Sequence, residues 1–138
     1  MFLDASVIVA ILGREPGFEE IEKRLAMIDG DLHISPLVRF EASVALARLK
    51  SGNVRPSPNL LRQAMQAVDA FVTDLEVAEM SISPEIGSKA LEASALYGKA
   101  VGHVADLNFG DCFAYACAKA LGVALLYKGD DFAKTDLA

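Results

Sequence analysis

Hydrophobic and polar positions divide the chain into short apolar runs and longer stretches in which apolar residues recur every three or four positions. The short runs, at residues 1–3, 32–35, 77–82 and 123–127, predict β-strands. The longer stretches between them predict α-helices, because that spacing places apolar side chains on one helical face. Strands that alternate with helices over this length predict an α/β fold with a mainly parallel central sheet flanked by helices.

Several predicted helices have clear start or stop signals. Ser35 followed by Pro36 supplies an N-cap and a proline at the first helical position, and Gly52 follows the end of that helix. Pro16 and Pro84 mark two other starts, and Gly122 marks a C-cap. The predicted helices cover residues 7–12, 16–28, 36–50, 59–73, 84–96 and 109–121.

The length and composition indicate one globular domain over residues 1–138. Hydrophobic residues make up 53% of the chain and charged residues 23%, which is typical of a compact core and not of disorder. The first apolar stretch, residues 7–12, has no basic residue before it, so we expect neither a signal peptide nor a membrane span. The expected location is the cytoplasm.

The two cysteines, Cys112 and Cys117, are expected to be packing residues. They lie five positions apart on one predicted helix, which places their Cα atoms too far apart for a disulfide. Small buried thiols of this kind behave as apolar side chains.

The formal net charge of −6 argues against strong non-specific binding to nucleic acid, which depends on Lys and Arg. It does not exclude a nuclease, because bound cations offset negative charge where a phosphate must approach. The basic residues Arg39, Arg48 and Arg55 are candidates for guiding an RNA backbone, and a solvated surface role fits each of them equally well.

Acidic residues recur where strands end or helices begin: Asp4, Glu41, Asp111, and the adjacent pair Asp130 and Asp131. In an open parallel sheet these positions face the crevice at the carboxyl ends of the strands, where ligands bind. Carboxylates gathered there repel one another unless protons or a cation intervene. The pattern therefore predicts a site for a hard divalent cation and metal-dependent chemistry on phosphates.

Each acid also has a purely structural explanation. Asp4 can cap the next helix, Asp111 can favour the first turn of its helix, and Gly-Asp-Asp is ordinary turn chemistry. A glutamate in the middle of a helix is usually solvated, but this explanation fits Glu41 less well, because its neighbours along the helix face are apolar. The coincidence of all these positions at equivalent ends of one sheet favours a functional site.

Four segments in order, LDAS, FEAS, LNFGDCFAYACAKALG and LLYKGDDFAKTDL, together resemble PIN domains, specifically the VapC-like ribonuclease toxins of bacterial toxin–antitoxin pairs. The resemblance spans essentially the whole chain. It implies a small PIN-like three-layer fold and an endoribonuclease that cleaves RNA with Mg²⁺ or Mn²⁺. It also implies a homodimer and inhibition by a small VapB-like antitoxin.

The same resemblance assigns roles to the acids. Asp4, Glu41 and Asp111 match the three principal acids of the family site. The fourth catalytic acid falls on Asp130 or Asp131, with Asp131 favoured, and the expected metal ligands are Asp4, Asp111 and Asp131.

Two further positions bear on the same site. Ser6 matches a small hydroxyl residue with an accessory role, as Asp130 would if Asp131 is the fourth acid. Asp106 stands where the family more often has a neutral or basic residue, which leaves substrate contacts at that edge open.

The residues do not exclude two other functions. A metal-dependent phosphatase would share an acidic magnesium pocket but would normally need a second acid close to its nucleophilic aspartate, which DAS lacks. A non-catalytic PIN-like module could bind RNA or a protein without cutting it. His33 and His103 have no partner at ligand spacing and are expected to be structural.

Overall fold

The fold is built on a four-stranded, wholly parallel sheet in the order β3-β2-β1-β4. The computed structural model describes residues 1–138. The strands are short: β1 is Phe2–Leu3, β2 is His33–Ile34, β3 is Ala78–Glu79 and β4 is Leu125–Leu126. Since β1 lies between β2 and β4, the residue that follows it, Asp4, emerges at the middle of the sheet edge.

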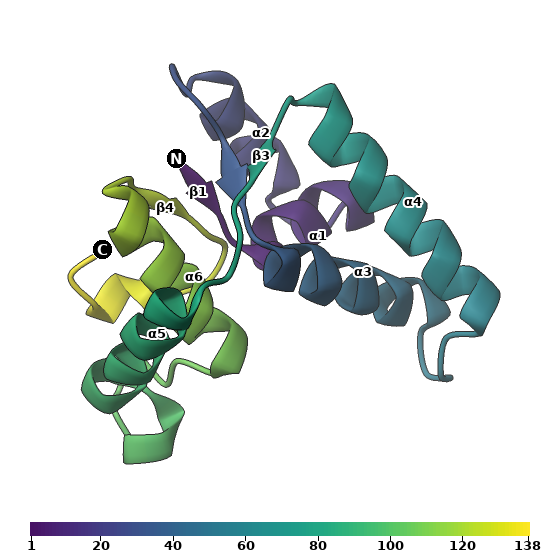
Figure 1. The fold of residues 1–138 in the computed structure, drawn as a ribbon. Helices are drawn as coiled ribbons and strands as arrows, with labels where there is room; N and C mark the ends of the chain where they lie inside the picture. Colours follow the sequence, from purple (N-terminus) through teal and green to yellow (C-terminus); the bar gives the residue numbers. More distant parts are fainter.

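Six α-helices and one 3₁₀ helix connect the strands, a second 3₁₀ helix follows β4, and helices cover both faces of the sheet. Figure 1 shows α5 and α6 on one side of the sheet and α1, α3 and α4 on the other, which confirms the predicted three-layer α/β arrangement. No helix is long and apolar enough to cross a membrane. The α-helices are α1 Ala5–Gly13, α2 Phe18–Ala26, α3 Pro36–Ser51, α4 Pro58–Asp74, α5 Pro84–Tyr97 and α6 Phe109–Leu121, and the 3₁₀ helices are η1 Lys99–Val101 and η2 Asp131–Lys134.

Three of these helices begin with the same Ser-Pro signal. The side chains of Ser35, Ser57 and Ser83 each accept a hydrogen bond from the backbone N–H three residues later. The proline that follows each serine occupies a position where its missing N–H costs nothing. This explains why α3 and α5 begin where the sequence predicts, and why α4 begins within one residue of its predicted start.

The core lies between the sheet and both helical layers. The side chains of β1 are fully buried, and Ile34 and Leu126 from the flanking strands are buried beside them. Cys112 and Cys117 are also buried and unpaired on α6, in keeping with a packing role. A rigid apolar layer therefore supports the residues that leave the carboxyl ends of the strands.

The structure differs from the sequence prediction most at α2 and at β3; in addition, α1 begins at Ala5 and not at residue 7, and β4 covers only Leu125–Leu126 of the predicted residues 123–127. The helix predicted from Pro16 begins at Phe18, because Gly17 takes a left-handed conformation (φ 88°), and it ends at Ala26. The strand predicted over residues 77–82 is reduced to Ala78–Glu79 at the edge of the sheet, where both residues are exposed. A strand at the edge of a sheet pairs with only one neighbour, so fewer of its residues form regular strand hydrogen bonds. The apolar alternation over residues 77–82 therefore predicts a longer strand than the structure contains.

Candidate active site

The predicted acids meet at the carboxyl edge of the sheet. Asp4 directly follows β1, Glu41 lies in the second turn of α3, Asp111 is the third residue of α6, and Asp131 begins η2 after β4. Asp4 is close enough to Asp131 and Glu41, and Asp111 to Glu41 and Asp131, for their charges to repel. The sequence prediction that these four residues share one region therefore agrees with the structure.

Asp4 is both the cap of α1 and a member of this acidic cluster. Its Oδ2 accepts hydrogen bonds from the Ser6 backbone N–H (2.9 Å) and from the Ser6 hydroxyl (2.5 Å). The residue is only 6% exposed. The capping explanation and the functional one are thus compatible, because the cap fixes one oxygen of a carboxylate that still belongs to the cluster.

Asp111 is oriented by a reciprocal capping box with Asn108. The Asn108 backbone N–H donates to Asp111 Oδ2 (2.9 Å), and the Asp111 N–H donates to Asn108 Oδ1 (3.0 Å). Asn108 is not among the predicted site residues, although an Asn three residues before an acid at a helix start is a usable sequence signal. The box leaves Asp111 Oδ1 free of protein hydrogen bonds.

Glu41 is half-buried on α3 and packs against the first turn of α6. A Cβ at Gly110 would overlap the Glu41 carboxylate, so glycine is the residue that leaves room for it. No protein hydrogen bond or ion pair satisfies that carboxylate.

Asp130 and Asp131 are exposed and unpartnered. Neither side chain takes part in a hydrogen bond or an ion pair within the protein, and Asp130 does not cap η2. Both carboxylates are available to a ligand, and the structure brings Asp131 into electrostatic range of Asp4 and Asp111.

Burial and mutual repulsion raise the pKa of three carboxyls. Burial, followed by the charges of Asp4 and Asp111, raises the pKa of Glu41 to about 7. Burial is also the main cause for Asp111, whose pKa rises to about 6 with smaller contributions from neighbouring acids that include Asp106. The pKa of Asp4 is raised by burial, against the effect of its hydrogen bonds with Ser6.

No basic side chain neutralises the cluster. None of the six ion pairs includes Asp4, Glu41, Asp111 or Asp131. Arg39, considered from the sequence as a guide for RNA, is paired with Asp69 and Glu79 instead. The cluster therefore combines hard oxygen donors with uncompensated negative charge.

This donor set fits a hard divalent cation such as Mg²⁺. No three Asp, Glu, His or Cys side chains converge as a complete ligand set. Magnesium, however, is usually held by one or two carboxylates, and water or substrate oxygens complete its octahedron. The Nδ1 of His103 accepts a hydrogen bond from the Ala105 N–H, and its ring lies edge-on against Tyr97, in keeping with the expected structural role.

A hollow of about 410 Å³ opens beside Glu41 between α3 and the start of α6. Arg48, exposed and free of ion pairs, is the basic residue on its wall. Its other lining residues are mainly apolar and include Phe40, Phe109 and Gly110. One basic and one acidic side chain, Arg48 and Glu41, thus line the same mainly apolar hollow.

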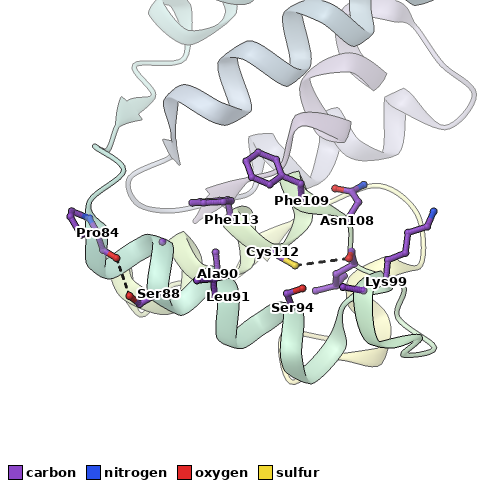
Figure 2. Close-up of a pocket in the computed structure, with 13 residues that line it drawn as sticks. Pro84, Ser88, Ala90, Leu91, Ser94, Lys99, Asn108, Phe109, Cys112 and Phe113 are labelled. Atoms are coloured by element: carbon purple, nitrogen blue, oxygen red, sulfur yellow. Dashed lines mark hydrogen bonds between the residues drawn. The ribbon is translucent and has the colours of Figure 1, made fainter.

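Two apolar hollows lie outside the acidic cluster. The first, of about 790 Å³ between α5 and α6, includes Leu91, Phe109 and Phe113, as Figure 2 shows. The second, of about 650 Å³, lies between α1, α2 and α4 and includes Leu12, Leu25 and Phe71. Neither hollow contains any of the four clustered acids.

Comparison with known proteins identifies the sequence relatives. The model of the PIN domain family matches residues 1–137. A VapC ribonuclease of Rhizobium meliloti is 54% identical over 140 residues, covering 99% of this chain and 98% of the relative. Ribonuclease VapC30 of Mycobacterium tuberculosis is 36% identical over 142 residues, covering 100% of this chain and 96% of the relative.

Solved structures show the same fold. The crystal structure of Mycobacterium tuberculosis VapC20, described as a toxin that cleaves the sarcin–ricin loop, has a TM-score of 0.71 at 19% identity and covers 96% of this chain and 92% of that one. A toxin–antitoxin complex from Klebsiella pneumoniae has a TM-score of 0.67 at 15% identity, with coverage of 99% and 92%.

Proposed function

The chain belongs to the PIN-domain family, among its VapC ribonucleases, and from this premise we propose that it is the endoribonuclease toxin of a toxin–antitoxin pair and depends on Mg²⁺. Mn²⁺ has the same preference for oxygen ligands and is the natural substitute. The proposed site of action is the cytoplasm, where the RNA is found.

One observation carries the metal dependence. Four acids gather at one sheet edge with no cationic partner, and burial raises the pKa of Asp4, Glu41 and Asp111. Such an arrangement disfavours its own ionised state unless a cation binds. A functional role for the cluster explains why this unfavourable charge is present.

Asp4, Asp111 and Asp131 are the proposed ligands, with one or two of these carboxylates binding the ion directly and the remainder holding its waters. Ser6 holds one oxygen of Asp4, and the Asn108 N–H holds one oxygen of Asp111, so both carboxylates are oriented before a ligand arrives. A divalent cation bound there would lower the pKa of a water and offset charge that develops on the scissile phosphate.

Glu41 is the proposed proton acceptor. Its pKa of about 7 in the metal-free protein lies near neutral pH, where a carboxyl can both take up and release a proton. Because it has no hydrogen bond within the protein, its oxygens are free to receive a proton from water at the site. Gly110 leaves the space in which it can do so.

Arg48 is the proposed contact for the RNA backbone. It lines the same hollow as Glu41 and takes part in none of the ion pairs within the protein. A single exposed guanidinium beside an acidic site would bind a phosphate that flanks the scissile one, and so set the register of the strand.

The proposed antitoxin surface is the groove between α1, α2 and α4. Its walls are apolar, with Leu25 from α2 and Phe71 from α4, and an amphipathic helix would bury its apolar face there. Phe18, the first residue of α2, does not line this groove. We further propose that an arginine of the antitoxin occupies the acidic site by bidentate pairing with carboxylates.

The proposed homodimer surface is the apolar face of α5 and α6 (Figure 2). Leu91 is 75% exposed and Phe109 is 71% exposed on this face, and contiguous exposed apolar residues mark protein interfaces. Replacing Leu91 with Glu should convert a dimer into a monomer in sedimentation experiments.

The toxin assignment is tested by inducing the chain alone and together with the small protein encoded beside its gene. Growth arrest and RNA cleavage on induction, both relieved by the neighbouring protein, are expected. RNA binding without cleavage would indicate a non-catalytic module, and hydrolysis of small phosphoesters alone would indicate a phosphatase.

A further inference from the structure

We propose that Lys128 is a positioning residue that fixes the loop carrying Asp131 against the helix capped by Asp4. Lys128 lies two residues after the last residue of β4 and three before Asp131. This inference rests on the proposed function, because it assigns to Lys128 the placement of the fourth metal-site acid.

The backbone of Lys128 is joined to Asp4 through one hydroxyl group. The Lys128 N–H donates to Ser6 Oγ (3.0 Å), and that hydroxyl donates in turn to Asp4 Oδ2 (2.5 Å). The loop after β4 is therefore connected to the first acid of the cluster across 122 residues of sequence. A small shift of the loop would disturb the orientation of that carboxylate.

The side chain of Lys128 reaches the opposite end of the same helix. Its Nζ donates to Glu15 Oε2 (2.7 Å), and the two side chains are 32% and 29% exposed. Glu15 lies two residues after α1 ends, and its N–H donates back to the Ala10 carbonyl (2.9 Å). One residue thus attaches the loop to both ends of α1, which the Asp4 side chain caps.

In the segment that follows, the one hydrogen bond is local, from the Ala133 N–H to the Asp130 carbonyl (3.1 Å), and no side chain is anchored before Phe132. Gly129 has a φ of 104°, and the side chains of Asp130 and Asp131 are exposed without protein partners. Phe132 is 2% exposed and lies 5.0 Å from the Tyr127 ring, centroid to centroid. The acid is therefore held between Lys128 on one side and a buried phenyl ring on the other.

The charge of Lys128 has a second consequence. The Glu15 carboxylate keeps the ammonium at the far end of α1, although the Lys128 backbone lies beside the acidic cluster. Without Glu15, a flexible lysine would be drawn toward the carboxylates of that cluster by their charge. The ion pair thus keeps a competing cation out of the proposed metal site.

The test compares Lys128→Met and Glu15→Gln with the wild type. Lys128→Met keeps most of the apolar stem and removes the ammonium. Affinity for Mn²⁺ is measured by calorimetry, and the melting temperature is measured in EDTA. Lys119→Met is the matched control, because it removes an ion pair of similar length (2.6 Å, to Asp136) away from the acidic cluster.

Both Lys128→Met and Glu15→Gln should weaken Mn²⁺ binding about tenfold, which is typical when a residue that orients a metal ligand is lost. The control should retain wild-type affinity. Lys128→Arg should restore most of the affinity, as should the charge exchange Glu15→Lys with Lys128→Glu. In RNA cleavage the effect should fall on kcat, with KM unchanged.

Wild-type Mn²⁺ affinity in both Lys128→Met and Glu15→Gln would overturn the inference while leaving the proposed function intact. A melting temperature that falls further than in the control, with unchanged Mn²⁺ affinity, would show that Lys128 is only a structural residue. If the wild type binds no divalent cation, the proposed function fails and this inference fails with it.

Discussion

The Glu41 carboxylate on α3 lies directly against Gly110 in the first turn of α6, in the space that a Cβ at residue 110 would occupy. This relationship joins two helices that are far apart in sequence at the proposed catalytic edge. Gly110 has no requirement for a left-handed conformation, so its lack of a side chain is what the packing uses.

Replacing Gly110 with Ala should therefore displace Glu41 and reduce RNA cleavage about a hundredfold, the scale expected for misplacement of a reacting group by about 1 Å. The fold should persist, because the position is helical and alanine favours helices. Gly87→Ala on α5 is the matched control, since a Cβ there meets no neighbour. Equal cleavage by both variants would show that the position of Glu41 is not critical.

Asp111→Asn should raise the melting temperature of the metal-free protein while abolishing RNA cleavage. The amide oxygen can still accept the hydrogen bond from the Asn108 N–H, so the capping box survives. What is lost is a partly buried negative charge beside Asp4 and Glu41. Thermal denaturation in EDTA measures this effect, and a large fall in melting temperature would indicate that the carboxylate is mainly structural.

The metal-free protein should lose stability as the pH rises from 3.8 to about 7. The pKa of Asp111 is raised from 3.8 to about 6, and that of Glu41 from 4.5 to about 7. Within this range the folded protein binds more protons than the unfolded chain, so the free energy of unfolding decreases with pH. Urea denaturation in EDTA at several pH values measures this contribution.

The double variant Glu41→Gln with Asp111→Asn is the control for that dependence. Since it lacks both raised pKa values, its free energy of unfolding should change less with pH over the same range. An identical pH profile for the variant and the wild type would contradict the account of the cluster.

Much of the fold could be predicted from the sequence, because local signals set its helix boundaries. Ser35-Pro36 and Ser83-Pro84 determine helix starts, because each serine hydroxyl accepts a hydrogen bond from the backbone N–H three residues later. The error at α2 arose because Gly17, and not Pro16, makes the turn into the helix. The length of β3 was overestimated because edge pairing is a tertiary property.

The sequence predicts which acids form the candidate site, but it does not predict how they are arranged in space. Asp4 and Asp111 stand at positions that any parallel α/β sheet brings to one edge. The contact of Glu41 with Gly110 and the ion pair of Lys128 with Glu15 link residues 69 and 113 positions apart, through packing that no local pattern encodes. Tertiary packing also pairs Arg39 with Asp69 and Glu79, which the local sequence does not predict.

Arg48→Gln should weaken RNA binding and raise KM, because it removes the basic side chain beside Glu41. The slope of log affinity against log salt concentration should decrease by about 1, as expected for one lost phosphate contact. Arg39→Gln is the comparison variant. It should lower the melting temperature through its lost ion pairs and leave the salt slope unchanged, and equal slopes for Arg48→Gln and the wild type would refute the phosphate contact.

The most direct test of the central claim is cleavage of a defined single-stranded RNA by the purified protein across a Mg²⁺ titration, beside the variant Asp4→Asn. The wild type should cut only when Mg²⁺ is present and stop in EDTA, and Asp4→Asn should remain inactive at every concentration with its fold intact by circular dichroism. Full cleavage in EDTA, or wild-type cleavage by Asp4→Asn, would contradict the assignment of the acidic cluster as a metal-dependent active site.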